Sequence, residues 1–463
     1  KSIFYFRYGE TILLFNLIYF FIGVVFAFMV LKNPDNFLKL FLASIIIGPL
    51  VKISGYPLLD EFWVIMLLFG LFLRKFLITK LIIEKSETKN FNLHEKAFIF
   101  LTLYFLFQSF RGGVWLEDPR MFRWVIFFII VGLSFFVFSN YKGSIDPNYV
   151  AKIVLYSTTI YFLLYFLSGY IYELLTGMSK AGELQNLYVS GSSVTTFPTA
   201  IYAIALIILN QRNKSLGDNI KGINLLIVLS FIIATSTYVY YDSRAGIFAI
   251  LSALVLNFLF QLLQKNKRGI FQFFLIVSFL IGYQFWAVNY SESNRRIQDF
   301  LPIDSELNLA LPRNLSQEKG RPRILAPKAA FNFITEDPFH TLFGYGWYMS
   351  RYELIEPIQQ MRKHEQMIRL NLSKNKPYQA AGGIALMVDT GFIGIFLYLL
   401  NLLLGFSAIL KSQNNSKYVV SIVYLSVILW AFVGTITSLL LFYFWVMPNN
   451  PVILMLEKNE KKI

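Results

Sequence analysis

Residues 11–31 read TILLFNLIYFFIGVVFAFMVL and contain no charged side chain. A helix that crosses a bilayer needs about 20 mostly apolar residues, so this stretch is long enough to span one. The apolar run is continuous, whereas a strand of a membrane barrel alternates apolar and polar residues. The stretch therefore predicts a transmembrane helix.

Similar stretches recur along nearly the whole sequence. They predict an all-α polytopic membrane protein with about 12 (roughly 11–13) transmembrane helices and one large extracytoplasmic loop. The predicted spans are residues 11–31, 38–54, 58–78, 96–110, 121–140, 150–170, 193–210, 222–238, 245–263, 269–288, 380–410 and 418–446.

The composition of the chain agrees with this fold class. Of its 463 residues, 56% are hydrophobic and only 15% are charged, against roughly 25% charged in ordinary soluble domains. The chain has too few charged residues to cover the surface of a soluble globular protein of this size. A disordered chain would contain far fewer apolar residues. The absence of cysteine excludes a disulfide framework and a cysteine-ligated metal site.

The net charge of +15 is interpreted first as a signal of membrane topology. Short loops rich in Lys and Arg mark the cytoplasmic side of a membrane protein. Four basic loops agree on one alternation, which places the long segment 289–379 outside. The same alternation places the N-terminus outside, although Lys1 and Arg7 favour the inside. The basic loops contain Arg74, Lys75, Lys80, Lys85, Lys89, Arg212, Lys214, Lys221, Lys265, Lys267, Arg268, Lys411 and Lys417.

Spans and loops together divide the chain into four parts. The N-terminal and C-terminal parts consist of transmembrane helices, and a central group of helices precedes the large loop. The predicted parts are residues 1–192, 193–288, 289–379 (the outer loop) and 380–463.

The outer loop contains a candidate anion site. Arg321 and Arg323 stand just ahead of a helix predicted over residues 324–334, which Pro338 is expected to end. Arginine binds phosphate through bidentate, charge-assisted hydrogen bonds, and a helix N-terminus favours anions. The alternative is an ordinary solvated charged face.

Two further charged residues lie at or inside predicted spans. Arg244 is at the outer mouth of the span 245–263, where it either points into the bundle or extends to the lipid head groups. Asp389 is deep in the apolar stretch that starts at residue 380, and an ionisable group there is a functional candidate. The alternative for Asp389 is a neutral, hydrogen-bonded side chain.

Other kinds of site find little support. The three histidines, His94, His340 and His364, have no metal-ligand spacing, and no nucleotide-binding fingerprint is present. We therefore predict neither a metal nor another cofactor. Outer aromatic residues such as Trp347 and Tyr348 are typical of interfacial anchors, with sugar stacking as the alternative.

Three motifs occur together in order. They are SRAG at residues 243–246, RILAPKAAFNFITEDPFHTLFGYG at 323–346 and VDTGFIGIFLYLL at 388–400. As an ordered set they resemble the O-antigen ligase and polymerase superfamily of bacterial envelope glycosyltransferases. The region of resemblance runs from about residue 190 to about residue 410, as the motif positions and the alternation of spans indicate.

The resemblance implies a glycosyltransferase at the periplasmic face of the bacterial inner membrane. It implies transfer of a glycan from an undecaprenyl-pyrophosphate carrier, with Arg244, Arg323 and Arg321 holding the pyrophosphate. A polymerase adds the glycan to a carrier-linked repeat unit, and a ligase adds it to the lipid A core. The candidates for a general base are Asp389, His364 and Glu365.

One departure from the family pattern separates these two activities. Ligases carry a His-Asn pair shortly before the glycine that corresponds to Gly391, and this chain has Tyr378 and Gln379 in the matching region. The sequence therefore favours a polymerase, with the ligase as the alternative. His340 and His364 are the alternatives for the missing histidine, although their spacing does not indicate it. A lipid-linked oligosaccharide flippase or a transporter is the alternative of another class.

The expected partners follow from the polymerase interpretation. They are an undecaprenyl-pyrophosphate-linked oligosaccharide, the lipid bilayer and a chain-length-regulating co-polymerase. Nucleic acid is not expected.

Overall fold

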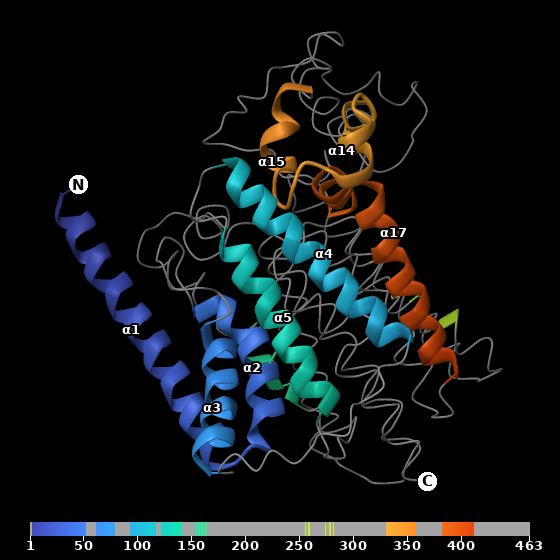
Figure 1. The fold of residues 1–463 in the computed structure, drawn as a ribbon. Helices are drawn as coiled ribbons and strands as arrows, with labels where there is room; N and C mark the ends of the chain where they lie inside the picture. Colours follow the sequence, from blue (N-terminus) through green and yellow to red (C-terminus); the bar gives the residue numbers. More distant parts are fainter. Residues whose placement is uncertain are drawn as a thin grey trace.

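The computed structural model describes six stretches of the chain and a few isolated positions between residues 153 and 163 and between 255 and 281. Within these residues all regular structure is helical, and none of it is strand (Figure 1). The described stretches are 2–51, 62–78, 93–116, 122–140, 330–357 and 382–411.

Six of the predicted spans are helices in the structure. The predicted spans between residues 193 and 238 and from 418 to 446 lie outside the described residues, and only isolated positions of the other three are described. The count of about 12 spans and the extent of the outer loop therefore stay predictions. The observed helices are α1 (Ser2–Lys32), α2 (Asn36–Val51), α3 (Phe62–Ile78), α4 (Leu93–Leu116), α5 (Phe122–Asn140) and α17 (Gly382–Lys411).

Two of these helices are long and apolar enough to cross a membrane. Leu93–Val114 of α4 has 22 residues and mean hydropathy 1.3, and Gly383–Lys411 of α17 has 29 residues and mean hydropathy 2.3. At 1.5 Å per residue the first is about 33 Å long, against a hydrocarbon core of about 30 Å. The shorter apolar helices are Leu17–Lys32, Asn36–Ile47 and Arg123–Phe138.

Helices α1 and α3 pack closely because small residues face each other. A Cβ added to Gly70 would lie 2.5 Å from the main-chain oxygen of Ala27, so only glycine permits this approach. Nearer the other end, the Trp63 indole N–H donates to the carbonyl of Tyr19 at 2.7 Å. Arg74 donates to the carbonyls of Leu31 and Lys32 at the end of α1. These bonds satisfy polar main-chain groups that a helix end leaves unpaired.

The helices alternate in direction, so their ends divide into two sets. The C-terminal ends of α1, α3 and α17 lie at one end of the bundle, and the start of α1 lies at the other (Figure 1). Arg74 and Lys411 therefore share an end, as the predicted alternation requires. Which end faces the cytoplasm stays a prediction.

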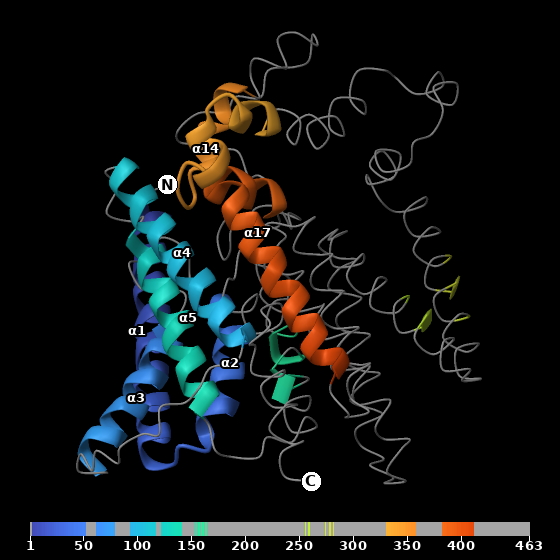
Figure 2. The same ribbon diagram turned by 45° about the vertical axis from the view of Figure 1, so that its right-hand side comes forward.

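Two short helices lie over the end of the bundle opposite Lys411. They are α14 (Pro338–Phe343) and α15 (Ser350–Glu353), and α14 sits over the start of α17 in both views (Figures 1 and 2). The structure differs from the sequence prediction at Pro338. The preceding helix ends at Thr335, and Pro338 begins α14 with Asp337 as its N-cap. Proline is favoured there because its fixed φ suits a first helical turn.

Candidate functional site

A break in α17 creates the centre of the site. Gly391 has φ 65° and ψ −170°, so it interrupts the helix within the predicted span 380–410. Residues 344–347, called here the inserted turn, bond to the carbonyls at the break. The Tyr345 N–H donates to Val388 O, and the Gly346 N–H donates to Asp389 O, both at 2.9 Å. The outer segment is therefore joined to the helix through main-chain hydrogen bonds.

Two glycines make this approach possible. Gly344 has φ 68° and Gly391 has φ 65°, a left-handed conformation that other residues rarely adopt. A Cβ added to Gly344 would lie 2.6 Å from Asp389 C and from Gly391 N. Neither position accepts a side chain without displacing the backbone of the other segment.

A second surface that holds the inserted turn is a polar stripe on α4, formed by Tyr104, Gln108 and Arg111. These residues are four and three positions apart, so they share one helix face. The Tyr104 hydroxyl donates to Thr390 O at 2.7 Å, which occupies a third carbonyl at the break. Gln108 Nε2 donates to the Tyr104 hydroxyl at 2.9 Å and to Phe343 O at 2.8 Å.

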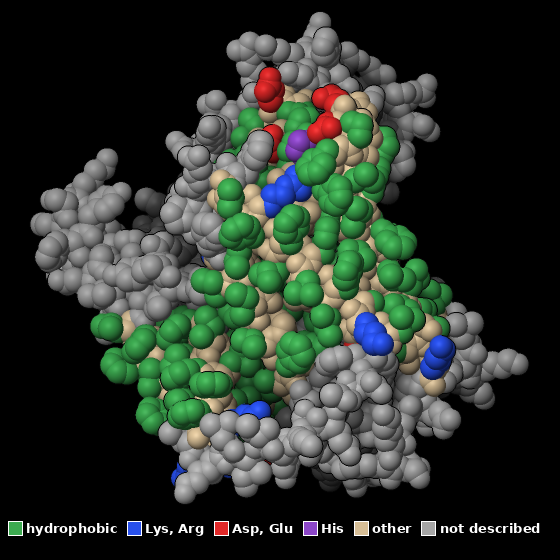
Figure 3. Space-filling model, viewed as in Figure 1, with side chains coloured by type: hydrophobic (Ala, Val, Ile, Leu, Met, Phe, Trp, Pro, Cys, Tyr) green, Lys and Arg blue, Asp and Glu red, His purple; other side chains and the backbone are tan. Residues whose placement is uncertain are grey.

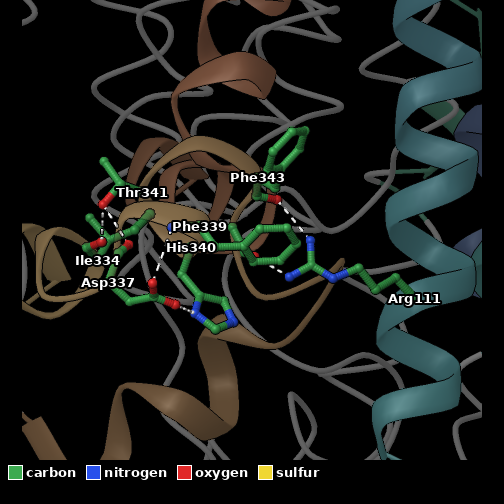
Figure 4. Close-up of polar contacts among 8 residues, drawn as sticks. Arg111, Ile334, Asp337, Phe339, His340, Thr341 and Phe343 are labelled. Carbon is green, nitrogen blue, oxygen red and sulfur yellow. Dashed lines mark hydrogen bonds and ion pairs between the residues drawn. The ribbon is translucent and has the colours of Figure 1, made fainter.

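Arg111 completes the stripe at its outer end (Figure 4). One terminal nitrogen donates to Phe343 O at 3.1 Å and to Gln108 Oε1 at 3.2 Å, and the other donates to Gly344 O. Its guanidinium also lies 5.2 Å from the centre of the Phe339 ring. Hydrogen bonds from a charged donor contribute about 1.5–3 kcal/mol each, so Arg111 is a strong restraint on the turn.

Asp389 is buried, with 5% of its surface exposed. Its Oδ1 accepts the main-chain N–H of Ser350 at 2.6 Å. The carboxyl therefore anchors the start of α15 to α17. This geometry corresponds to the hydrogen-bonded alternative that the sequence left open for Asp389.

Aromatic residues at the end of the inserted turn have separate environments. Trp347 is buried, and its ring lies 5.0 Å from the rings of both Phe105 and Phe128. It therefore packs inside the helix group, and neither sequence interpretation, interfacial anchor or sugar platform, applies to it. Tyr348 has φ 75° and stacks against the Arg351 guanidinium at 4.1 Å. Burial raises the pKa of Tyr348.

Acidic residues and one histidine surround α14. The Asp337 carboxyl accepts the Phe339 N–H at 3.1 Å and pairs with Nδ1 of His340 (Figure 4). The bond from the Phe339 N–H, and then the contact with His340, lower the pKa of Asp337. Glu353 lies close enough to interact with His340, and burial raises the pKa of this glutamate. In the described part of the chain, no three His, Asp or Glu side chains cluster as metal ligands.

The structure places only one of the predicted site residues. Asp389 is described above, whereas Arg244, Arg321, Arg323, His364 and Glu365 lie outside the described residues. Sequence reasoning missed the α4 stripe and the pairing of Asp337 with His340. The available signal for the stripe was the helical spacing of three polar residues within an otherwise apolar segment.

The described geometry contains a broken apolar helix, an outer turn inserted into it and a polar stripe that holds both. The segment that contains the turn and the break can be compared with known families. Residues 229–399 match the Wzy_C family model, O-antigen ligase. The predicted resemblance to the O-antigen ligase and polymerase superfamily is thereby confirmed.

The O-antigen ligase match has consequences for both membrane location and activity. The family covers ligases and polymerases, which are membrane proteins that transfer glycans. All three predicted arginines and the whole inserted turn lie within residues 229–399, whereas the stripe on α4 lies outside them. No curated protein matches the chain.

Proposed function

We propose that this protein is a membrane glycosyltransferase of the O-antigen polymerase type. It transfers a glycan from an undecaprenyl-pyrophosphate carrier to a carrier-linked repeat unit at the periplasmic face of the bacterial inner membrane. The observation that carries the proposal is the match of residues 229–399, which contains the first two ordered motifs and all but the last residue of the third. The expected partners are the lipid-linked oligosaccharide, the bilayer and a chain-length-regulating co-polymerase.

The proposed chemistry depends on stabilising a leaving pyrophosphate. Arg244, Arg323 and Arg321 are assigned to bind it, because guanidinium groups make paired hydrogen bonds to phosphate oxygens. Charge that is already in place when the leaving group departs contributes about 3–4 kcal/mol per donor. The reaction proposed here needs no metal. The sequence candidates for the general base are Asp389, His364 and Glu365.

The choice of polymerase over ligase rests on residues 378 and 379. Tyr378 and Gln379 stand where the ligases have histidine and asparagine, so the base implied for ligases is absent from that position. The described geometry adds a reason to expect an enzyme rather than a flippase. The inserted turn ties the outer segment to α17 and α4 through main-chain bonds, which suits a fixed site better than a moving gate.

A reconstituted assay distinguishes the three activities. The purified full chain in nanodiscs is incubated with labelled undecaprenyl-pyrophosphate-linked oligosaccharide, in EDTA and without an ion gradient. A polymerase lengthens the carrier-linked glycan, and a ligase labels added lipid A core. A flippase gives no product but moves labelled lipid across the bilayer of proteoliposomes, and that result would overturn the proposal.

The arginine assignment is tested in the same assay. Arg244→Ala and Arg323→Ala are each expected to lower kcat about 100- to 1,000-fold, the effect of losing one stabilising donor. Arg212→Ala is the matched control, because Arg212 lies in a loop predicted to be cytoplasmic. Normal rates in both test variants at matched protein amounts would remove these arginines from the site.

A further inference from the structure

The pair formed by Asp337 and His340 has the geometry of an oriented base. The two carboxyl oxygens of Asp337 have different partners. Oδ1 accepts the Phe339 N–H at 3.1 Å, and Oδ2 contacts Nδ1 of His340. The first bond is the N-cap of α14, so the orientation of the Asp337 carboxyl is fixed independently of His340.

The plane of the His340 ring is also fixed. The ring stacks on that of Tyr345 at 3.9 Å between centroids and 7° between planes. Tyr345 stacks in turn on Phe333 at 4.9 Å. Tyr345 belongs to the inserted turn, which is held to α17 by main-chain hydrogen bonds. Because the imidazole stacks on Tyr345, the same main-chain bonds help to position the His340 ring.

Among the described residues, the second ring nitrogen of His340 makes no hydrogen bond. An ionised Asp337 accepts from Nδ1–H, and the Nε2 lone pair is then available to accept a proton. In Figure 4 the other ring nitrogen points away from the Asp337 carboxyl. The His340 side chain is 24% exposed, so a substrate can reach it.

The surroundings of His340 suit a lipid-linked substrate. Phe331, Phe339 and Leu342 are large, exposed apolar side chains on or beside α14. Figure 3 shows acidic side chains at this end of the molecule and hydrophobic side chains over much of the face below them. Among the described residues, the groups that face the imidazole are Asp337, Glu353 and the rings of Tyr345 and Phe339. A hydroxyl carried on a membrane-anchored glycan would approach along such a boundary.

We propose that His340, oriented by Asp337, is the general base of glycan transfer in this protein. The inference rests on the proposed function and adds a group that the family pattern does not place there. Nε2 takes the proton from the acceptor hydroxyl as its oxygen bonds to the anomeric carbon. The bond from that carbon to the pyrophosphate oxygen breaks, and its electron pair leaves with the pyrophosphate. The proton on Nε2 then passes to water.

Asp389 is less suited to this task. It is 5% exposed, and its Oδ1 is occupied by the Ser350 N–H, whereas the His340 side chain is 24% exposed and only its Nδ1 has a hydrogen-bond partner among the described residues. His340 also supplies a histidine to a chain that has Tyr378 at the family position. Of the candidates that the structure describes, His340 on α14 is therefore better placed as the base than Asp389.

The test uses the full chain in nanodiscs and four proteins: wild type, His340→Ala, Asp337→Asn and the control Glu336→Gln. Asparagine caps a helix as well as aspartate, so Asp337→Asn keeps α14 while it removes the charge beside the imidazole. Glu336 is the exposed acidic neighbour of Asp337; it contributes only an electrostatic interaction with Tyr345, and among the described residues it makes no hydrogen bond to His340. Initial rates give kcat and KM for donor and acceptor, and added imidazole tests chemical rescue.

The expected result is a loss in kcat with little change in KM. His340→Ala should lose about 100-fold or more, the size of a general-base contribution, with KM within about twofold. Asp337→Asn should lose about tenfold, because an outer partner that orients a histidine contributes about 10–100-fold. Imidazole should raise the rate of His340→Ala but not that of Asp337→Asn, and Glu336→Gln should match wild type.

Three outcomes would overturn the inference. The first is a His340→Ala variant that keeps more than half of the wild-type kcat. The second is a loss of activity that imidazole does not restore and that accompanies a fall in Tm, which would make the pair a structural cap only. The third is a wild-type chain that transfers to neither acceptor, which would overturn the proposed function as well. Wild-type transfer to lipid A core alone would overturn the polymerase assignment but leave His340 to be judged by its variants.

Discussion

At the scale of single residues, the site depends on the backbone conformation of two glycines, which a hydropathy profile does not detect. Gly391 lies in the sequence VDTGFIGIF, which is apolar enough to continue a transmembrane helix. The structure instead places it at φ 65°, directly against Gly344 at φ 68°. A side chain at either position would meet backbone rather than a side chain that can move aside.

Replacing Gly391 by alanine tests this contact. The left-handed conformation costs a non-glycine residue about 1–3 kcal/mol, before the clash with the inserted turn is added. Gly391→Ala is expected to lower Tm by several degrees and to reduce glycan transfer. Gly132→Ala is the control, because a Cβ there would meet only Thr102 Cγ2 at 4.0 Å. An unchanged Tm for Gly391→Ala would contradict the observed break.

Asp389 has two candidate roles that substitutions separate. Asparagine offers an oxygen to the Ser350 N–H, so Asp389→Asn should keep the Tm and most of the transfer rate. Leucine leaves that buried N–H without its partner, which costs about 1–3 kcal/mol, so Asp389→Leu should lower the Tm. A stable Asp389→Asn protein without activity would instead assign proton transfer to this carboxyl. Thermal unfolding and transfer rates of the two variants decide between the roles.

At the scale of elements, sequence and structure agree on the helices and differ on how they are joined. Windows of apolar residues located α1 to α5 and α17, because bilayer thickness fixes the length of a span. Averaging hydropathy over a window concealed the polar stripe on α4, since three polar residues barely alter the mean hydropathy of a long apolar helix. The break at Gly391 depends on contacts with distant residues, so local sequence did not reveal it. The start of α14 has a local signal, the N-cap Asp337 followed by Pro338, which the prediction of a helix end at Pro338 did not use.

The Arg111 side chain provides a test of the stripe. Lysine keeps the charge but lacks the planar fork that reaches Phe343 O and Gly344 O together. Arg111→Lys should weaken the inserted turn by about 1–2 kcal/mol, which corresponds to roughly tenfold faster amide exchange at Tyr345 and Gly346. Hydrogen exchange with mass spectrometry measures this rate.

Arg74→Lys is the matched control for that experiment. Arg74 also donates to two main-chain carbonyls, but at the end of α1 on the opposite end of the bundle. It should leave exchange in the inserted turn unchanged. Equal exchange in wild type and Arg111→Lys would show that the arginine does not restrain the turn.

At the scale of the whole molecule, the directions of the helices predict a membrane topology that chemical labelling can test. The chain has no cysteine, so every introduced thiol is unique. Arg74 and Lys411 lie at one end of the bundle, and α14 and α15 lie at the other (Figure 1). The distribution of Lys and Arg in short loops predicts that the first end is cytoplasmic.

Single-cysteine variants test this topology in intact cells. Glu336→Cys should react with a membrane-impermeant maleimide added from outside, because Glu336 is an exposed residue beside α14. Lys411→Cys should react only after the inner membrane is permeabilised. The same accessibility for both positions would contradict a bundle that separates two aqueous compartments, and a reversed pattern would invert the orientation.

The inserted turn has a consequence for how such a protein can diverge. Its bonds to α17 use main-chain N–H and C=O groups, which every residue except proline supplies. Provided that the glycines remain, the side chains on the turn and on α17 can be exchanged without opening the joint. If the proposed glycan substrate changes, substitutions on the exposed surface can therefore accumulate while the main-chain bonds between the inserted turn and α17 are kept. Homologues that share these main-chain bonds would keep the same fold after most of their residues had been substituted.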